Sequence, residues 1–264
     1  MLRHIKYYYD QRYLLRLFIV NDLRSRYTGS VSGIYWSVIN PLLMILIYTF
    51  VFSAVLKIEF HKGSGTLNFA FYLICGMLPW LSIQDSVLRS TTSIAENSDL
   101  VKRAKFPASI LPIHIVLSNL LTMLIGLAIL IIILILTGNH ISPAILQIFL
   151  LLIPQLMFTL GLSWMFSSIY VFIRDIQPFI GNFVLLWMFL TPVFYPSTIF
   201  PEKYEIFLIL NPAAHIVNLY REVIMKGNII QPLSYITLII ESAVTFFAGY
   251  VVYTKLQPKF TDRL

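Results

Sequence analysis

Long apolar runs with few or no charges alternate with short polar segments along this chain. A helix needs about 20 predominantly apolar residues to cross a bilayer. The pattern therefore predicts an all-α integral membrane protein with six transmembrane helices in a single transmembrane domain over residues 1–264. The predicted spans cover residues 38–56, 67–86, 108–136, 144–172, 179–191 and 233–254.

Three of these spans have unusual features. Gly76 and Pro79 are expected to interrupt the second span. The third span, residues 108–136, would be roughly 43 Å long at 1.5 Å per residue, against a hydrocarbon core of about 30 Å. We expect it to tilt or to project into the cytoplasm. The fifth span, residues 179–191, is short for a helix that crosses a bilayer.

Residues 1–34 are predicted to lie on the cytoplasmic side and to include an amphipathic helix at the membrane interface. Charged residues break its apolar runs too often for it to span a membrane. Its apolar stripe is imperfect, because Leu14 and Phe18 lie away from the face of Tyr13 and Leu17. The alternative interpretation is a peripheral anchor with no further role.

Residues 87–107 form the most polar internal segment and end with helix signals. Asn97 or Ser98 is a possible N-cap, basic residues lie in the last turn and Pro107 ends the helix. These signals predict a short cytoplasmic helix between two spans. The alternative is a solvated loop whose charges only set the topology. The apolar side chains expected to be available to a partner are Leu100, Val101 and Phe106.

Residues 192–230 contain four prolines in an otherwise apolar stretch that also carries charges. Because proline breaks helices, we predict a broken, re-entrant helical hairpin on the outer side, before the last span. Arg221 and Glu222 are predicted to form a neutralising pair that holds this hairpin. His114 and Glu241 are the ionisable candidates within the membrane, and each either lies near a span end or pairs inside the bundle.

Composition and charge are typical of a membrane protein and argue against a soluble domain. The chain is 58% hydrophobic and 12% charged, whereas soluble proteins average about 25% charged residues. With both termini cytoplasmic, fourteen of the 19 Lys and Arg residues fall on the inner side, as the positive-inside rule requires. Because the basic residues lie between apolar runs, the net charge of +7 does not indicate a nucleic-acid partner. The single cysteine, Cys75, allows no intrachain disulfide, and the sequence contains no Cys/His metal cluster.

The sequence also lacks several common catalytic motifs. It has no G-x-x-x-x-G-K-[ST] phosphate-binding loop, no H-E-x-x-H and no G-x-S-x-G. We therefore predict no catalytic residues, no metal site and no cofactor in this chain. Any transport that is powered must be powered by another polypeptide.

Four segments resemble one family of membrane proteins. RSRYTGSVSGIYWSVINPLLMILIY is similar to the amino-terminal signature of ATP-binding-cassette type-2 permeases, in the polysaccharide-exporter branch. NSDLVKRAKFPASILP resembles the first cytoplasmic loop of these permeases and RDIQPFI the second. TPVFYP, FPEKY and LNPAAHIVNLYREVI together resemble the re-entrant outer region. The resemblance covers nearly the whole chain.

The resemblance implies a permease subunit that exports a lipid-linked polysaccharide of O-antigen, capsule or teichoic-acid type across the bacterial cytoplasmic (inner) membrane. It implies a homodimer with two ATPase subunits that bind ATP and Mg, an undecaprenyl-diphosphate-linked glycan as substrate, and contact with membrane lipids. The alternatives are an exporter of drugs or other small molecules and a membrane-embedded glycan-modifying enzyme. Short loops and many aromatic residues favour a polysaccharide.

The resemblance also assigns roles to individual residues. Closure of the ATPase would be transmitted by Asn97, Ser98, Asp99, Leu100, Val101, Lys102, Arg103, Lys105 and Phe106, and by Arg16, Arg24 and Arg26. Aromatic rings that stack on sugars would line a path between two copies. The candidates are Tyr35, Tyr48, Phe52, Trp80, Trp187, Phe194 and Tyr195, each of which is alternatively a packing or lipid-facing residue. Arg174 and Asp175 would lie near the cytoplasmic side of the dimer or simply neutralise each other.

Overall fold

The computed structural model describes most of the chain. It covers residues 11–26, 39, 43–44, 46–47, 50–55, 66–103, 106–139, 141–197 and 200–264, without the side chains of residues 52–54, 66–68 and 202. Every element within these ranges is helical, as the all-α prediction required. Of the predicted first span, residues 39, 43–44, 46–47 and 50–55 are described, and the last of these ranges forms a π-helical segment, η2 (Phe50–Val55).

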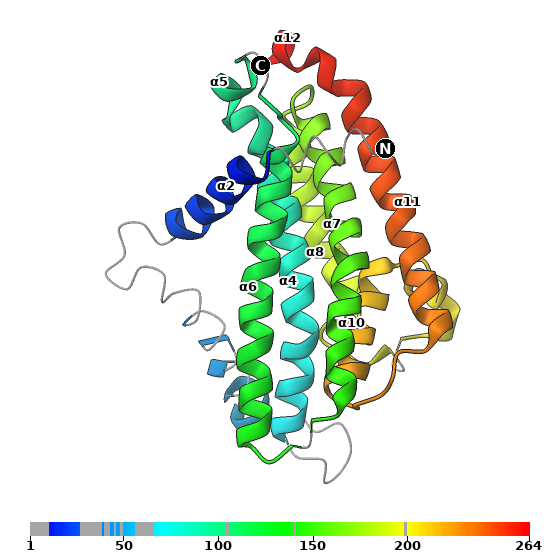
Figure 1. Ribbon diagram of the computed structural model, residues 1–264. Coiled ribbons are helices and arrows are strands. Elements are labelled where there is room, and N and C mark those ends of the chain that lie inside the picture. Colours follow the sequence, from blue (N-terminus) through cyan, green and yellow to red (C-terminus); the bar gives the residue numbers. More distant parts are fainter. Residues whose placement is uncertain are drawn as a thin grey trace.

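Four helical segments are long and apolar enough to cross a membrane. They contain α4 (Thr66–Glu96), α6 (Ile110–Leu136), α7 (Ile148–Tyr170) and α11 (Pro232–Leu256). Figure 1 shows them side by side in an elongated bundle, in which α7 contacts α4, α6 and α11. The shorter α8 (Ile176–Leu190) packs against α4 and α7. A total of six spans and the sides on which the termini lie remain predictions.

The helix α4 is longer than the predicted second span, and neither Gly76 nor Pro79 interrupts it. It runs to Glu96, ten residues beyond the predicted end of the span at residue 86. The polar residues of its last turns hydrogen-bond within the helix. The hydroxyls of Thr91 and Ser93 donate to carbonyls three or four residues earlier, both at 2.7 Å. These hydroxyls therefore need no water molecule as a hydrogen-bond partner, and the side chains can be buried while the chain stays helical.

Helices α7 and α11 cross where each carries a glycine, Gly161 and Gly249. A Cβ on Gly249 would lie 2.7 Å from the Cα of Gly161, and a Cβ on Gly161 would lie 2.7 Å from the Cα of Phe246. Glycine lets two backbones approach this closely, as small residues do in membrane helix pairs. The ring of Trp164 packs beside the crossing, 5.3 Å from that of Phe246.

Gly249→Ala is expected to destabilise the purified protein by about 1–3 kcal/mol, because the added methyl group must push the two helices apart. Thermal unfolding in detergent measures the effect. The matched control is Gly181→Ala in α8, where a Cβ has no atom within 4 Å. This control should unfold at or above the wild-type temperature, because alanine favours helix over glycine. Equal losses in both variants would contradict the crossing.

The two ends of the bundle carry different elements. One end, the α5 end, carries α2 (Arg12–Ser25), α5 (Ser98–Val101) and α12 (Phe260–Arg263), in the upper part of Figure 1. The other, the α10 end, carries the turn after α6 and the connection from α10 (Pro212–Ile224) to α11. The charge count predicts that the α5 end is cytoplasmic.

Candidate functional site

Helix α2 lies against α6 at the α5 end and has two apolar faces. On one face, the ring of Phe18 lies 6.2 Å from that of Phe106 and 5.1 Å from that of His114. On the other face, Tyr13 is 78% exposed and Leu17 is 45% exposed. These two faces explain the imperfect stripe, since one packs on the protein and the other is left for a lipid surface.

A buried carboxylate ties α2 to α4. The Asp22 side chain accepts hydrogen bonds from Arg26 Nε and Nη2, at 3.1 and 2.8 Å. It also accepts from both terminal nitrogens of Arg89, which belongs to α4. Burial alone raises the pKa of Asp22, but the hydrogen bonds and charges of Arg89 and Arg26 outweigh burial and hold that pKa below its usual value. The sequence did not suggest this joint, because Asp22 and Arg89 are far apart along the chain.

Asp22→Asn is expected to destabilise the protein at pH 7 by about 2 kcal/mol, since charged hydrogen bonds are lost. Because the folded-state pKa of Asp22 is lowered, its contribution is fully present above the unfolded pKa of about 3.9 and is lost as the pH falls through the folded pKa. The gap in thermal unfolding temperature between wild type and variant should therefore be full at pH 7 and narrow as the pH falls below about 4. Asp99→Asn, at an exposed aspartate of the same end, is the control and should show no such difference. A gap between Asp22→Asn and wild type that does not narrow as the pH falls below about 4 would contradict the joint.

The segment predicted to couple to an ATPase forms a single helical turn, α5, at the end of α4. The Asn97 side chain does not cap it, because its amide donates instead to the carbonyl of Ser93 at 2.8 Å. Val101 is buried, so the expectation that this side chain is available to a partner is wrong. The side chain of Val101 is held in the core by a cluster of aromatic and aliphatic residues at the α5 end. This cluster includes Ile94, Ala108, Leu111, Trp164, Tyr253 and Phe260.

The charged residues around α5 remain at the surface. Lys102 and Arg103 follow α5 directly and are exposed, as is Asp99 within it. Ser98 and Leu100 are partly buried. On α2, the predicted coupling residues Arg16 and Arg24 are also exposed. Lys105 lies outside the described residues. The structure therefore places basic side chains from α2 and from the α5 turn at one end of the bundle.

One predicted path residue lies in the core. Trp80 is fully buried, so it is not a path-lining residue at the surface of the protein. Its ring meets that of Trp187 edge-on at 5.5 Å, and its Nε1 donates to Gln84 Oε1 at 3.0 Å. Trp187 is half-buried, and its Nε1 donates to Asn211 Oδ1 at 3.0 Å. Tyr35, Tyr48 and the side chain of Phe52 lie outside the described part of the chain.

Helix α8 carries an aromatic row in which Trp187 was predicted from the sequence and Phe179 and Phe183 were not. Phe179, Phe183 and Trp187 are four residues apart, the spacing that places side chains on one helix face. The rings of Phe179 and Phe183 stack 6.4 Å apart, and Phe183 lies 5.7 Å from Trp187. Phe179 is 67% exposed and Phe183 is 42% exposed. We call these three residues the α8 aromatic face; their spacing was the signal in the sequence.

Two further path candidates follow α8. Phe194 and Tyr195 are half-buried. The ring of Phe194 lies 6.0 Å from that of Phe189, and the Tyr195 hydroxyl donates to the Phe189 carbonyl at 2.8 Å. Both residues therefore pack back onto the end of α8.

The predicted pair between Arg221 and Glu222 is wrong. Arg221 is buried and donates to the carbonyls of Tyr72 at 3.1 Å, Val193 at 2.5 Å and Pro192. It also donates to the Tyr72 hydroxyl at 3.0 Å, and its guanidinium lies 3.6 Å from the centre of the Tyr72 ring. Glu222 points to other partners and accepts from Lys226 Nζ at 2.5 Å.

Arg221 therefore joins three segments: α4, the chain after α8, and α10. A Cβ on Gly76 of α4 would lie 2.7 Å from Arg221 Cζ, so a glycine is needed beside the guanidinium. A planar guanidinium with five donors suits a cluster of carbonyls that no lysine could satisfy equally. We call Arg221 and its four acceptors the Arg221 clamp.

Residues 192–230 form short helical pieces: η5 (Glu202–Tyr204), α9 (Ile206–Ile209) and α10 (Pro212–Ile224). Asn211 begins α10, because its Oδ1 accepts from the backbone amides of Ala213 and Ala214, and Pro212 takes the first helical position. Asn211 Nδ2 also donates to Thr191 Oγ1 at 3.0 Å, which ties α10 to the end of α8. That this region is a re-entrant hairpin in a membrane remains a prediction.

The two ionisable candidates have partners inside the bundle. The Nδ1 atom of His114 lies 3.1 Å from the carbonyl of Ile110. Glu241 Oε1 lies 3.6 Å from Nε2 of His215 on α10. Among the described residues, no three His, Cys, Asp or Glu side chains are grouped so that they could hold a metal ion.

Comparison with known proteins identifies the family. Residues 13–225 match the ABC-2 type transporter family. The chain is 31% identical to the O-antigen export system permease protein RfbA of Klebsiella pneumoniae, over 98% of this chain and 99% of the relative. It is 29% identical to the RfbA protein of Myxococcus xanthus over the whole of both chains. It is 23% identical to the polysialic acid transport protein KpsM of Escherichia coli, over 92% of this chain and 93% of the relative. The resemblance read from the sequence is thus confirmed, and the chain, a multi-pass membrane protein, belongs to the ABC-2 type transporter family.

Proposed function

We propose that this chain is the permease subunit of an exporter that moves a lipid-linked polysaccharide across the bacterial inner membrane. The observation that carries the proposal is the near full-length similarity to permeases named for O-antigen export and to a protein named for polysialic acid transport. A separate pair of ATPase subunits supplies the energy by hydrolysing ATP with Mg. Two copies of this chain form the transport unit, and the substrate is a glycan on undecaprenyl diphosphate.

The α5 end supports a role in coupling to the ATPase. Lys102 and Arg103 are exposed beside α5, where they can meet acidic groups of a partner. Val101 anchors the same turn in the core, so a push on α5 reaches the end of α4. The Asp22–Arg89 ion pair passes that motion from α4 to α2. Movement of a partner is thus transmitted to two helices through packed and ion-paired contacts.

The α8 aromatic face supports a role in guiding a glycan. The face of an aromatic ring carries partial negative charge, which attracts the polarised C–H groups of a sugar ring. Phe179 and Phe183 present such faces at the surface of the protein. A second copy of the chain placed against this surface would enclose a path lined by rings. Phe194 and Tyr195 lie just beyond the end of the row, next to Phe189.

Removal of this chain from cells is expected to abolish surface glycan and to leave lipid-linked glycan inside, where it can be quantified by mass spectrometry. The double variant Phe179→Ala/Phe183→Ala should restore at most a tenth of wild-type surface glycan. The control Phe247→Ala removes an exposed ring of α11 and should restore export fully. Normal surface glycan in cells without the chain would contradict the proposed function. A change in drug resistance without a change in glycan would favour the small-molecule alternative.

A further inference from the structure

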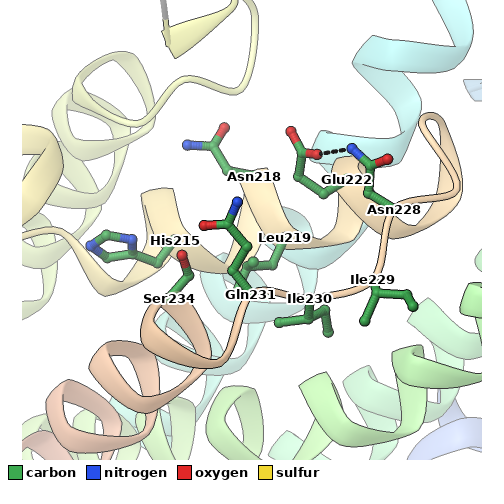
Figure 2. A pocket seen from close by; sticks show the side chains of 9 residues that line it. All are labelled: His215, Asn218, Leu219, Glu222, Asn228, Ile229, Ile230, Gln231 and Ser234. Atoms are coloured by element: carbon green, nitrogen blue, oxygen red, sulfur yellow. Dashed lines mark hydrogen bonds between the residues drawn. The ribbon is translucent and has the colours of Figure 1, made fainter.

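A polar cavity lies at the α10 end, apart from the α8 aromatic face. Its volume is about 470 Å³, and its walls come from α10, the connection after α10 and the first turn of α11. Such a volume is in the usual range for a ligand site of roughly 300–1,000 Å³. In Figure 2 the side chains of Asn218 and Glu222 project from the same side of the α10 helix, and Gln231 reaches toward the helix from the connection that follows it. Ser234 lies below Gln231.

The walls of the cavity are held in place by contacts with the rest of the protein. Gly227, at φ +63°, turns the chain sharply after α10, and a Cβ there would lie 2.7 Å from the Cβ of Ser142. The backbone amide of Ile230 donates to Gln147 Oε1 at 2.8 Å. Asn228 Nδ2 donates to Glu222 Oε2 at 2.8 Å across the mouth of the turn. Because these bonds fix the connection before any ligand arrives, little ordering is needed for binding.

Three lining side chains have hydrogen-bonding capacity that no described residue uses. Asn218, Gln231 and Ser234 make no side-chain hydrogen bond with another residue in the part of the chain that the structure describes. An amide carries a donor and an acceptor side by side, which matches two neighbouring hydroxyls of a sugar ring. Leu219 and Ile230 supply apolar surface between these polar groups. A sugar ring also alternates polar hydroxyls with apolar C–H faces, so its surface is complementary to that of the cavity.

The charge of the cavity selects against phosphate. None of the described lining residues is a lysine or arginine. Burial raises the pKa of Glu222, but hydrogen bonds from Lys226 and Asn228 outweigh burial and keep the pKa below its usual value. Glu222 is therefore an ionised acceptor whose charge is balanced by Lys226, and its remaining lone pairs can accept a hydrogen bond from a sugar hydroxyl. A lipid phosphate is disfavoured and an uncharged sugar is favoured.

We propose that this cavity binds one neutral sugar residue of the glycan after it emerges at the α10 end, the predicted outer side. Asn218, Gln231 and Ser234 bond its hydroxyls, and Glu222 accepts from a further hydroxyl. The inference rests on the proposed function for the identity of the natural ligand. The site is separate from the α8 aromatic face and would hold the glycan at the outer surface of the membrane between steps of export.

Saturation-transfer NMR on the permease–ATPase complex in lipid nanodiscs tests this site with methyl glycosides of mannose, galactose and glucose as probes. We expect transfer to at least one glycoside, reduced at least fivefold in Asn218→Leu/Gln231→Leu. The control Asn139→Leu changes an exposed asparagine of the turn after α6 and should keep full transfer. Gln231→Ala, at an exposed residue whose side chain caps no helix, is the milder variant and should lose part of the signal.

Absence of transfer to all three glycosides in the wild type would overturn the inference, as would transfer that both cavity variants retain. If the variants keep the wild-type unfolding temperature and still associate with the ATPase, misfolding is excluded as the cause of a lost NMR signal. These outcomes are distinct from failure of the proposed function, which appears as normal surface glycan in cells without the chain. If cells need the chain for export but the cavity takes no glycoside, only the cavity inference falls.

Discussion

Arg221→Met is expected to destabilise the protein by about 3–5 kcal/mol and to leave little folded permease after purification. Methionine approximates the length of the side chain but donates no hydrogen bond. The carbonyls of Tyr72, Pro192 and Val193 would lose their charged donor inside the protein, and each buried unpaired group costs about 1–3 kcal/mol. The yield of monodisperse protein and its thermal unfolding temperature measure the loss. Surface glycan should fall in parallel.

Two variants separate the Arg221 clamp from the pair that the sequence suggested. Glu222→Gln keeps the acceptor for Lys226 and should change stability little, because Glu222 is not a partner of Arg221. Arg221→Lys keeps the charge but loses the planar fork, so its stability should lie between wild type and Arg221→Met. A loss in Glu222→Gln as large as that in Arg221→Met would contradict the clamp and restore the ion pair between neighbours.

Charge reversal at the α5 end, Lys102→Glu/Arg103→Glu, is expected to reduce export at least tenfold while the permease still inserts and folds. Both side chains are exposed, so their replacement does not disturb the core. An ATPase surface that is complementary to two positive charges would instead meet two negative ones, and such like-charge contacts cost several kcal/mol. The readouts are the amount of ATPase that copurifies and its rate of ATP hydrolysis per permease.

The matched control is Lys259→Glu/Arg263→Glu, which makes the same change in charge at exposed residues of the same end. This control should copurify with the ATPase and export normally. If both double variants behave alike, the effect is one of topology or net charge. If the Lys102/Arg103 variant binds the ATPase and exports as wild type does, α5 is no coupling element.

Hydrophobicity along the chain was sufficient to place most of the bundle. Helix α6 begins at Ile110 and ends at Leu136, against a predicted span of residues 108–136. Helix α11, Pro232–Leu256, extends the predicted 233–254 by a few residues. Apolar residues that face lipid or protein give the same signal, so the span is visible without knowledge of its neighbours.

Polar side chains misled the prediction of helix ends where their hydrogen-bonding groups are satisfied within their own helix. The predicted second span ends at residue 86, and residues 87–107 are predicted to be a polar segment with either a short helix or a solvated loop. Thr91 and Ser93 instead donate to the helix's own carbonyls and are buried. Single-residue polarity cannot reveal this, since the same hydroxyl is paired by its own helix or by water.

Contacts between residues that are far apart in the sequence could not be predicted either. Arg221 and Glu222 looked like a pair because they are adjacent, yet consecutive helical residues point in different directions. The acceptors of Arg221 come from Tyr72 and from the chain after α8, which only the fold brings together. Trp80 was assigned to a surface path for the same reason, although α8 covers it through Trp187.

The measurement that tests the central claim most directly is glycan transfer in a reconstituted system. The purified permease with its ATPase is placed in liposomes that carry lipid-linked glycan, and the fraction of glycan that moves across the membrane is followed by its accessibility to an added glycosidase. We predict movement that requires ATP, the ATPase and this chain, and that falls at least tenfold in Lys102→Glu/Arg103→Glu. ATP hydrolysis by the intact complex without any movement of glycan would contradict the account.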